Sequence, residues 1–116
     1  MDKNIEISLL FDFYGRLLRE KQRSAVSLYH NDDLSLSEIS DILGITRQGV
    51  RDLVKRSEAE LFEYEEKLGL YKRFARVEGS ARHILDCAQT LRKESSDSKL
   101  IDEIIASAED IIEQEE

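Results

Sequence analysis

The sequence predicts an all-α fold, and three of its features lead to that prediction. Its 116 residues include no proline, the residue that breaks helices most strongly. Residues that favour helix, such as Leu, Ile, Glu, Lys and Arg, are abundant. Apolar side chains recur at spacings of three and four along most of the chain, which is the period of one helical face. A chain of this length can bury a core without disulfides or metals.

The N-terminal helix is expected over residues 4–18 and carries two apolar stripes. One stripe holds Ile5, Leu9, Phe13 and Leu17, and the other holds Ile7, Phe11, Tyr14 and Leu18. A helix that is apolar on most of its circumference either lies in a core or is shared with a partner, so a homodimer is expected. Gly15 predicts a bend or a close contact. A second helix follows over about residues 20–30 and ends at the polar residues 31–33.

The clearest local pattern begins at Ser35. With Glu38 it forms a capping box, in which each residue can bond to the backbone of the other and start a helix. That helix stops at Gly44, which can enter a left-handed turn without a side-chain clash. Thr46 can cap a further helix that runs through Lys67. The residues expected to face inward are Leu36, Ile39, Ile42 and Leu43 in the first helix, and Val50, Leu53, Val54, Leu61, Tyr64 and Leu68 in the second.

Residues 35–56 together satisfy the requirements of a helix-turn-helix. Two helices that cross steeply need a small residue where they approach, here Ser40, and a glycine in the turn, here Gly44. Apolar residues at Ile39, Leu43, Ile45, Val50 and Leu53 can lock the pair together. The sequence therefore predicts a helix-turn-helix domain over residues 1–69.

Residues 70–116 are expected to form an antiparallel helical hairpin with an acidic tail, in one compact unit with residues 1–69. A heptad seam runs through Leu70, Phe74, Val77, Ala81, Ile84, Ala88 and Leu91. A last helix, over about residues 97–113, places Ile101, Ile104, Ala108 and Ile111 inward. The polar stretch 94–98 between the helices is short enough for a hairpin, and the seam also favours a dimer.

Charge is distributed unevenly along the chain. The net charge is −8, and residues 94–116, with nine acids and one base, account for all of it. The remaining residues are neutral in sum, so the overall acidity does not exclude a nucleic-acid partner.

The composition favours a cytoplasmic binding protein rather than an enzyme. The single cysteine, Cys87, is expected in the core, and no apolar stretch reaches the roughly 20 residues of a membrane span. His30 is expected at the surface or as a cap, and it lies in a different helix from His83. Glycine loops for phosphates and paired catalytic carboxylates are both missing from the sequence, so we predict no catalytic residue, cofactor or metal site.

The second helix of the motif, from Thr46, would present a basic face if Val50, Leu53 and Val54 point inward. Arg47, Gln48 and Arg51 are then the candidates for reading base edges, because Arg pairs with guanine and Gln with adenine. Thr46, Lys55 and Arg56 are candidates for phosphate contacts. Asp52 lies on the same face and would repel phosphate. The alternative interpretation is a solvated charged face on a motif that contacts proteins.

Several segments resemble known proteins. Residues 18–23, 28–29, 34–39 and 43–50 resemble region 4 of bacterial sigma factors, and residues 52–56 and 63–70 narrow the similarity to the YlxM-like helix-turn-helix family. That resemblance implies a DNA-binding regulatory protein linked to the signal recognition particle pathway. The chain departs from the pattern at Arg19, where threonine is common, and at Gly49, where alanine is usual.

Two hypotheses follow from the sequence. The first is a DNA-binding regulatory protein that acts as a homodimer, with no membrane partner. The alternative is an accessory protein that binds the RNA or protein of the signal recognition particle through Lys72, Arg73, Arg76 and Arg82.

Overall fold

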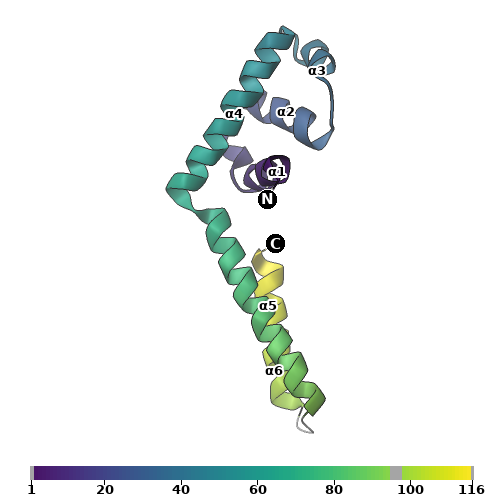
Figure 1. The fold of residues 1–116 in the computed structure, drawn as a ribbon, viewed down its shortest axis with the longest axis vertical. Helices are drawn as coiled ribbons and strands as arrows, with labels where there is room; N and C mark the ends of the chain where they lie inside the picture. The colour runs from purple at the N-terminus through teal and green to yellow at the C-terminus, as the bar shows by residue number, and fades with distance from the viewer. Residues whose placement is uncertain (1, 95–97, 116) are drawn as a thin grey trace. The chain divides into compact units, whose positions relative to one another are not determined.

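The computed structural model describes residues 2–94 and 98–115, and within them it contains helices and no strand. In chain order the elements are α1 (Lys3–Tyr14), the 3₁₀ turn η1 (Gly15–Leu17), α2 (Glu20–Val26), the π-helical turn η2 (Ser27–Asn31), α3 (Leu36–Leu43), α4 (Arg47–Leu68), α5 (Leu70–Glu94) and α6 (Lys99–Glu115), as Figure 1 shows. The predicted all-α fold is confirmed. None of the described helices has the length and apolar content that crossing a membrane requires.

The chain divides into two compact units, Met1–Tyr71 and Lys72–Glu116. The first unit contains α1 to α4 and the start of α5, and the second contains the rest of α5 with α6. The predicted arrangement of residues 1–69 and 70–116 in one compact unit stays a prediction.

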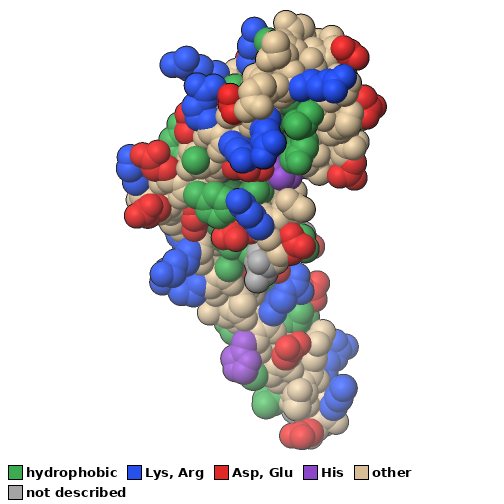
Figure 2. Space-filling view, turned by 45° about the horizontal axis from the view of Figure 1, so that its top comes forward, with side chains coloured by type: hydrophobic (Ala, Val, Ile, Leu, Met, Phe, Trp, Pro, Cys, Tyr) green, Lys and Arg blue, Asp and Glu red, His purple; other side chains and the backbone are tan. Residues whose placement is uncertain are grey.

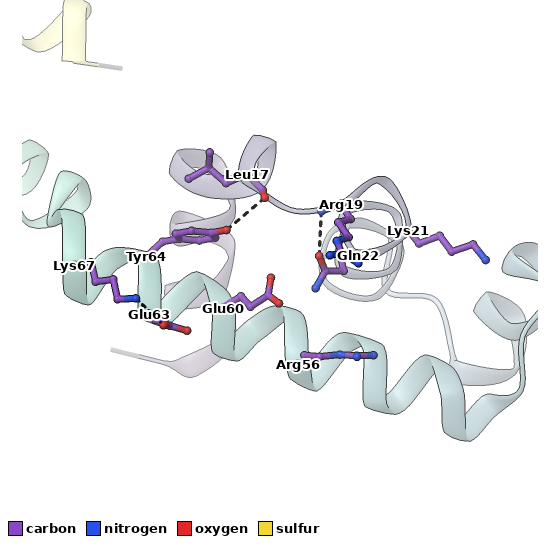
Figure 3. Close-up of a pocket in the computed structure, with 9 residues that line it drawn as sticks. All are labelled: Leu17, Arg19, Lys21, Gln22, Arg56, Glu60, Glu63, Tyr64 and Lys67. Carbon is purple, nitrogen blue, oxygen red and sulfur yellow. Dashed lines mark hydrogen bonds and ion pairs between the residues drawn. The ribbon is translucent and has the colours of Figure 1, made fainter.

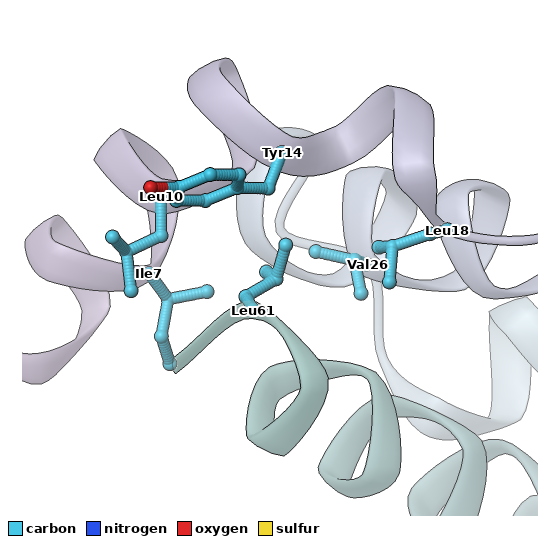
Figure 4. Packing of buried hydrophobic residues seen from close by; sticks show 6 residues of the cluster. All are labelled: Ile7, Leu10, Tyr14, Leu18, Val26 and Leu61. Carbon is cyan, nitrogen blue, oxygen red and sulfur yellow. The ribbon is translucent and has the colours of Figure 1, made fainter. Parts of the chain in front are cut away.

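In the first unit, one apolar cluster joins α1 and α2 to the middle of α4. It consists of the buried residues Ile7, Leu10, Tyr14, Leu18, Val26 and Leu61, which Figure 4 shows together. The helix predicted over residues 4–18 is shorter in the structure, because α1 ends at Tyr14 and the 3₁₀ turn η1 follows it. The predicted close contact at Gly15 is confirmed, since Gly15 is buried and a Cβ atom there would lie 3.2 Å from the Phe11 ring. Of the two apolar stripes predicted for the N-terminal helix, one packs into the core. The other stripe is partly in solvent, since its residues Ile5 and Leu17 are more than half exposed.

A second cluster in the same unit packs α2 and α3 against the first half of α4. Its buried residues are Ala25, Ile39, Val50 and Val54. Two predicted inward residues are wrong, because Ile42 is 60% exposed and Leu68 is 54% exposed. The short helix α3 turns Ile39 and Leu43 to the cluster and leaves Ile42 beside them, while Leu68 ends α4 next to the left-handed Gly69.

In the second unit, α5 and α6 form the predicted antiparallel hairpin. Ala88, Ile101 and Ile105 are buried between the helices with Leu85 against them, and Arg92 pairs with Asp102 at 3.3 Å. The predicted turn at residues 95–97, including Asp97 at the predicted start of the last helix, lies outside the described residues. So does Glu116, the end of the predicted acidic tail.

The buried seam of the hairpin differs from the heptad prediction by one residue at several positions. Ile105 and Ile112 are buried instead of the predicted Ile104 and Ile111, which are exposed. On α5, the predicted seam residues Ile84 and Leu91 are likewise exposed, and so is Cys87, whose predicted core position is wrong. Small residues explain the register, because the helices meet at the buried alanines Ala81, Ala88 and Ala108 and leave the neighbouring isoleucines at the edge.

Candidate nucleic-acid interface

The turn between α3 and α4 has the geometry of a helix-turn-helix. Gly44 ends α3 in the left-handed region at φ 69°, and its backbone N–H donates to the Ser40 carbonyl at 2.9 Å. The Ser40 hydroxyl donates to the carbonyl of Ile45, so the small residue predicted at the close approach also ties the turn to α3. The capping box is present as well, with both bonds between Ser35 and Glu38 at 3.1 Å.

The start of α4 is fixed by its cap. The Thr46 hydroxyl oxygen accepts a hydrogen bond from the Gly49 N–H at 3.0 Å. Glycine at position 49 leaves room for this bond, because a Cβ atom there would lie 3.1 Å from the Thr46 hydroxyl oxygen. An alanine at this position would require the Thr46 hydroxyl to move by a few tenths of an ångström. A hydroxyl that accepts one bond can still donate another, so Thr46 keeps a donor for a phosphate.

The second cluster sets which side of α4 faces outward. Val50 and Val54 are buried against α3, and the opposite side of the helix is exposed. All six predicted contact residues lie there: Thr46, Arg47, Gln48, Arg51, Lys55 and Arg56. Figure 2 shows basic side chains gathered over the end of the first unit that carries α3 and the start of α4.

Asp52 is held by its own helix. The Gln48 side-chain amide donates to the Asp52 carboxylate at 2.9 Å, one helical turn along the exposed face. One amide hydrogen of Gln48 is therefore used within the helix, while its second hydrogen and its carbonyl oxygen remain available for an adenine edge.

On one side of α4, basic residues from two helices form part of the wall of a hollow of about 400 Å³, together with apolar residues and Glu58. Arg51 and Lys55 of α4 line it together with Lys3 of α1. Its wall includes His30, whose ring nitrogen lies 2.5 Å from the Glu58 carboxylate and whose side chain is only 6% exposed. The prediction that His30 lies at the surface or caps a helix is wrong, because the π-helical turn η2 carries its ring inward against α4.

On the other side of α4, a hollow of about 740 Å³ opens between that helix and the start of α2. Figure 3 shows residues that line it, among them Arg19 and Lys21 of the α2 segment and Arg56 of α4. Glu63 and Lys67 close one end as an ion pair at 2.8 Å, which lowers the pKa of Glu63 and raises the pKa of Lys67.

Arg19 stands at the N-cap of α2, where its side chain cannot accept a backbone hydrogen bond. The Gln22 side chain compensates by accepting from the Arg19 N–H at 3.0 Å. One of the two hydrogen bonds of a capping box is therefore present, although arginine stands where threonine is common in the family. The replacement places a guanidinium at the edge of the 740 Å³ hollow.

Sequence reasoning missed three basic residues at this surface: Lys3, Arg19 and Lys21. None lies within the motif at residues 35–56, and each comes beside α4 only through packing of α1 and α2. Their grouping could not be read from helical periodicity. The only sequence signal was that Arg19 and Lys21 belong to the segment that resembles sigma region 4.

Two helices are joined here by a short turn that contains a left-handed glycine, and the second helix has an exposed basic face at its start. These features define a helix-turn-helix protein. Residues 1–107 match the family model UPF0122, "Putative helix-turn-helix protein, YlxM / p13 like", and the chain belongs to this family. The resemblance noted in the sequence is confirmed.

Curated relatives match along most of their length. The chain is 41% identical over 113 residues to a UPF0122 protein of Thermoanaerobacter sp. strain X514, which covers 95% of this chain and 97% of that protein. It is 48% identical over 86 residues to a protein of Caldanaerobacter subterraneus, covering 74% of each chain. A protein of Halalkalibacterium halodurans is 53% identical over 74 residues, covering 64% of this chain and 68% of its own.

Proposed function

We propose that this protein is a DNA-binding regulatory protein, rather than an enzyme, and that the first turns of α4 enter the major groove. The observation that carries the proposal is the exposed basic face of α4 within a correctly capped helix-turn-helix. Arg47, Arg51, Lys55 and Arg56 are all exposed there, and the buried cluster behind them orients the helix. This is the docking mode in which helix-turn-helix proteins present the N-terminal residues of their second helix to base edges.

Base reading is assigned to Arg47, Gln48 and Arg51. The two guanidinium groups can each donate two hydrogen bonds to a guanine edge. Gln48 is restrained by its bond to Asp52, which reduces the entropy lost when its amide pairs with an adenine. The same bond keeps the Asp52 carboxylate on the surface of its own helix.

Phosphate contacts are assigned to both flanks of α4. Lys55 and Lys3 line the hollow on one flank, and Arg56, Arg19 and Lys21 line the hollow on the other. A recognition helix flanked by cations on both sides is suited to the two phosphate backbones that border a groove. Each such contact adds salt dependence but no sequence preference.

The test measures binding of the full chain to a pool of duplex DNA over a salt series. Arg47→Ala with Arg51→Ala is compared with the matched double variant Arg73→Ala with Arg76→Ala on α5, which removes the same charge. We expect the α4 variant to lose sequence-selective binding and the α5 variant to keep it. Lys55→Ala should lower the slope of log K against log salt by about 0.9, the value for one phosphate contact.

If the wild type shows no salt-dependent binding to the pool, or if both double variants lose it equally, the proposed role of α4 is wrong. Far-ultraviolet circular dichroism of each variant checks that the helices are intact. All four arginines are exposed, so their removal leaves the buried clusters unchanged.

A second candidate function is favoured by the exposed basic residues Lys72, Arg73 and Arg76 at the start of α5. In this alternative the protein is an accessory factor that binds signal recognition particle RNA or protein, and the helix-turn-helix is a scaffold. Charge reversal at these three residues should then abolish binding to that RNA. The Arg47→Ala, Arg51→Ala variant should bind it as the wild type does, and the opposite pattern would exclude this alternative.

A further inference from the structure

One side of the α5–α6 hairpin is apolar and exposed, and the proposed DNA contacts make no use of it. On α6, Leu100 is 63% exposed and Ile104 is 46% exposed, and Ile111 adds a third exposed apolar residue. On α5, Ile84 and Leu91 are exposed in the same way. Monomeric soluble domains rarely leave large apolar side chains grouped on one surface.

These residues follow a simple rule of position. Ile84, Leu100 and Ile104 each directly precede a residue that packs between the helices: Leu85, Ile101 and Ile105, respectively. Ile111 likewise precedes the buried Ile112. A step of one residue turns a side chain by about 100° around the helix axis. Because α5 and α6 are antiparallel, the residue that precedes an inward-facing residue points to the same side of the hairpin on both helices.

The arrangement of the side chains confirms this common side. Ile84 of α5 and Leu100, Ile104 and Ile111 of α6 line one hollow of about 470 Å³. Ala108 also lines the hollow, so a small side chain lies among the larger ones. The hollow can therefore receive apolar side chains from a facing helix, as a core position of a helical bundle does.

The charges of the two helices indicate which partner fits. α5 carries six bases and three acids, whereas α6 carries six acids and one base. A second hairpin of the same sequence, related by a two-fold axis, can place its α6 beside this α5 and its α5 beside this α6. Opposite charges then border the apolar centre along both new helix pairs.

We propose that a second copy of this chain covers the apolar side of the hairpin, so that two α5–α6 pairs form a four-helix bundle. A single pair of helices has one shared interface, and here it holds alanines and isoleucines while further leucine and isoleucine side chains stay in water. Pairing two hairpins buries both sets, as in four-helix bundles with a common core. The resulting dimer carries two recognition helices, the number that a target with two half-sites requires.

The test is sedimentation velocity of the full chain between about 1 and 100 μM, where the mass of a reversible dimer depends on concentration. We expect the wild type to approach twice the chain mass of 13.4 kDa. The double variant Leu100→Glu, Ile104→Glu is expected to remain at the mass of one chain. Ile42→Glu is the matched control, because Ile42 is 60% exposed on α3 and should leave the dimer unchanged.

Cys87 provides a second measurement, because it is the only cysteine and lies between Ile84 and Leu91 along the exposed side of α5. Its reaction with a thiol reagent should slow as the concentration of the wild type rises, and it should stay fast in the double variant. A wild type that sediments as one chain throughout overturns the proposal, as does a double variant that still dimerises. Protection of Cys87 in a double variant that sediments as one chain also overturns it, because a part of the same chain would then cover this side.

Discussion

The two units of the chain bury different kinds of side chain. In the first unit, α1, α2, α3 and α4 enclose large residues such as Tyr14, Leu10 and Leu61, all with at most 1% of their surface exposed. In the second unit, the least exposed residues are the alanines Ala81 and Ala108, and several leucines and isoleucines remain in water. Both units also expose apolar side chains, such as Ile42 and Leu68 in the first. In the second unit, however, Ile84, Leu100, Ile104 and Ile111 line one hollow on one side of the hairpin.

This difference separates two tasks. A recognition helix must be held in one orientation, and the first unit does so with packing on one side of α4 and capping at its start. The hairpin contributes a surface, and a surface needs exposed apolar side chains. The proposed dimer and the proposed DNA contact are assigned to different units, so each can fail without the other.

The largest expected effect compares two leucines, one from each unit. Leu61→Ala removes a side chain that is 0% exposed in the first unit, and we expect it to lower the free energy of unfolding by about 2–5 kcal/mol. Leu100→Ala makes the same chemical change at a residue that is 63% exposed in the second unit. At concentrations where the chain is a monomer, that change should stay within about 0.5 kcal/mol of the wild type.

Urea unfolding followed by circular dichroism gives both values. Equal losses for Leu61→Ala and Leu100→Ala would remove the distinction between the two units. At concentrations where the dimer forms, the Leu100 variant should lose stability as well, because the same side chain is then buried.

The next largest effect concerns Tyr14, which joins α1 to the end of the first unit. Its hydroxyl donates to the Glu65 carboxylate at 2.6 Å and accepts from the Leu70 N–H at 2.9 Å. The same carboxylate oxygen accepts from the Tyr71 N–H at 3.0 Å. Tyr14 and Glu65 therefore act as the N-terminal cap of α5, whose first N–H groups have no partner within the helix.

Tyr14→Phe should lower the free energy of unfolding by about 1.5–3 kcal/mol near neutral pH, since it removes a buried bond to a carboxylate. The variant should also change the alkaline pH profile. Burial, followed by the bond to Glu65, raises the pKa of Tyr14 above its usual value of 10.0. The folded chain then keeps this proton to a higher pH than the unfolded chain does, so the contribution is full below about pH 10 and is lost as the pH rises through the folded pKa.

The difference in stability between wild type and Tyr14→Phe should therefore shrink above pH 10, as measured by urea unfolding at a series of pH values. A difference that stays constant up to pH 12 would show that the phenol does not titrate as this geometry requires. Leu61→Ala, which removes a buried side chain without a titratable group, is the control, and its loss of stability should show no such dependence near pH 10.

The helix-turn-helix could be predicted from the sequence because its determinants are local. The bonds between Ser35 and Glu38, and between Thr46 and Gly49, join residues three positions apart. A pattern of that length is visible in the chain itself. The ends of α3 and α4 were found for the same reason, since each is followed by a glycine with positive φ.

The flanks of the site could not be predicted, because they depend on contacts between distant segments. His30 and Glu58 are 28 positions apart, and Lys3 approaches Arg51 only once α1 has packed on α4. In the hairpin, adjacent isoleucines such as Ile104 and Ile105 fit a heptad equally well. The alanines of the facing helix decide between them, and the periodicity of one helix does not contain that information.

The smallest expected effects come from two glycines, one in each unit. Gly44 has a φ of 69°, which residues with a Cβ rarely adopt, whereas Gly79 lies within α5. Gly44→Ala should destabilise the chain by roughly 1–2 kcal/mol, although no atom crowds the position, because the strain is in the backbone. Gly79→Ala should stabilise α5 by roughly 0.5–1 kcal/mol, since open space surrounds its Cβ position and alanine loses less entropy in a helix.

Thermal unfolding of the two variants checks both signs against the wild type. The two substitutions add the same methyl group to uncrowded positions, so a shift of the melting temperature in opposite directions isolates the backbone conformation as the cause. A stabilising Gly44→Ala would mean that the turn between α3 and α4 is not left-handed, and the orientation of the recognition helix derived from it would then be wrong.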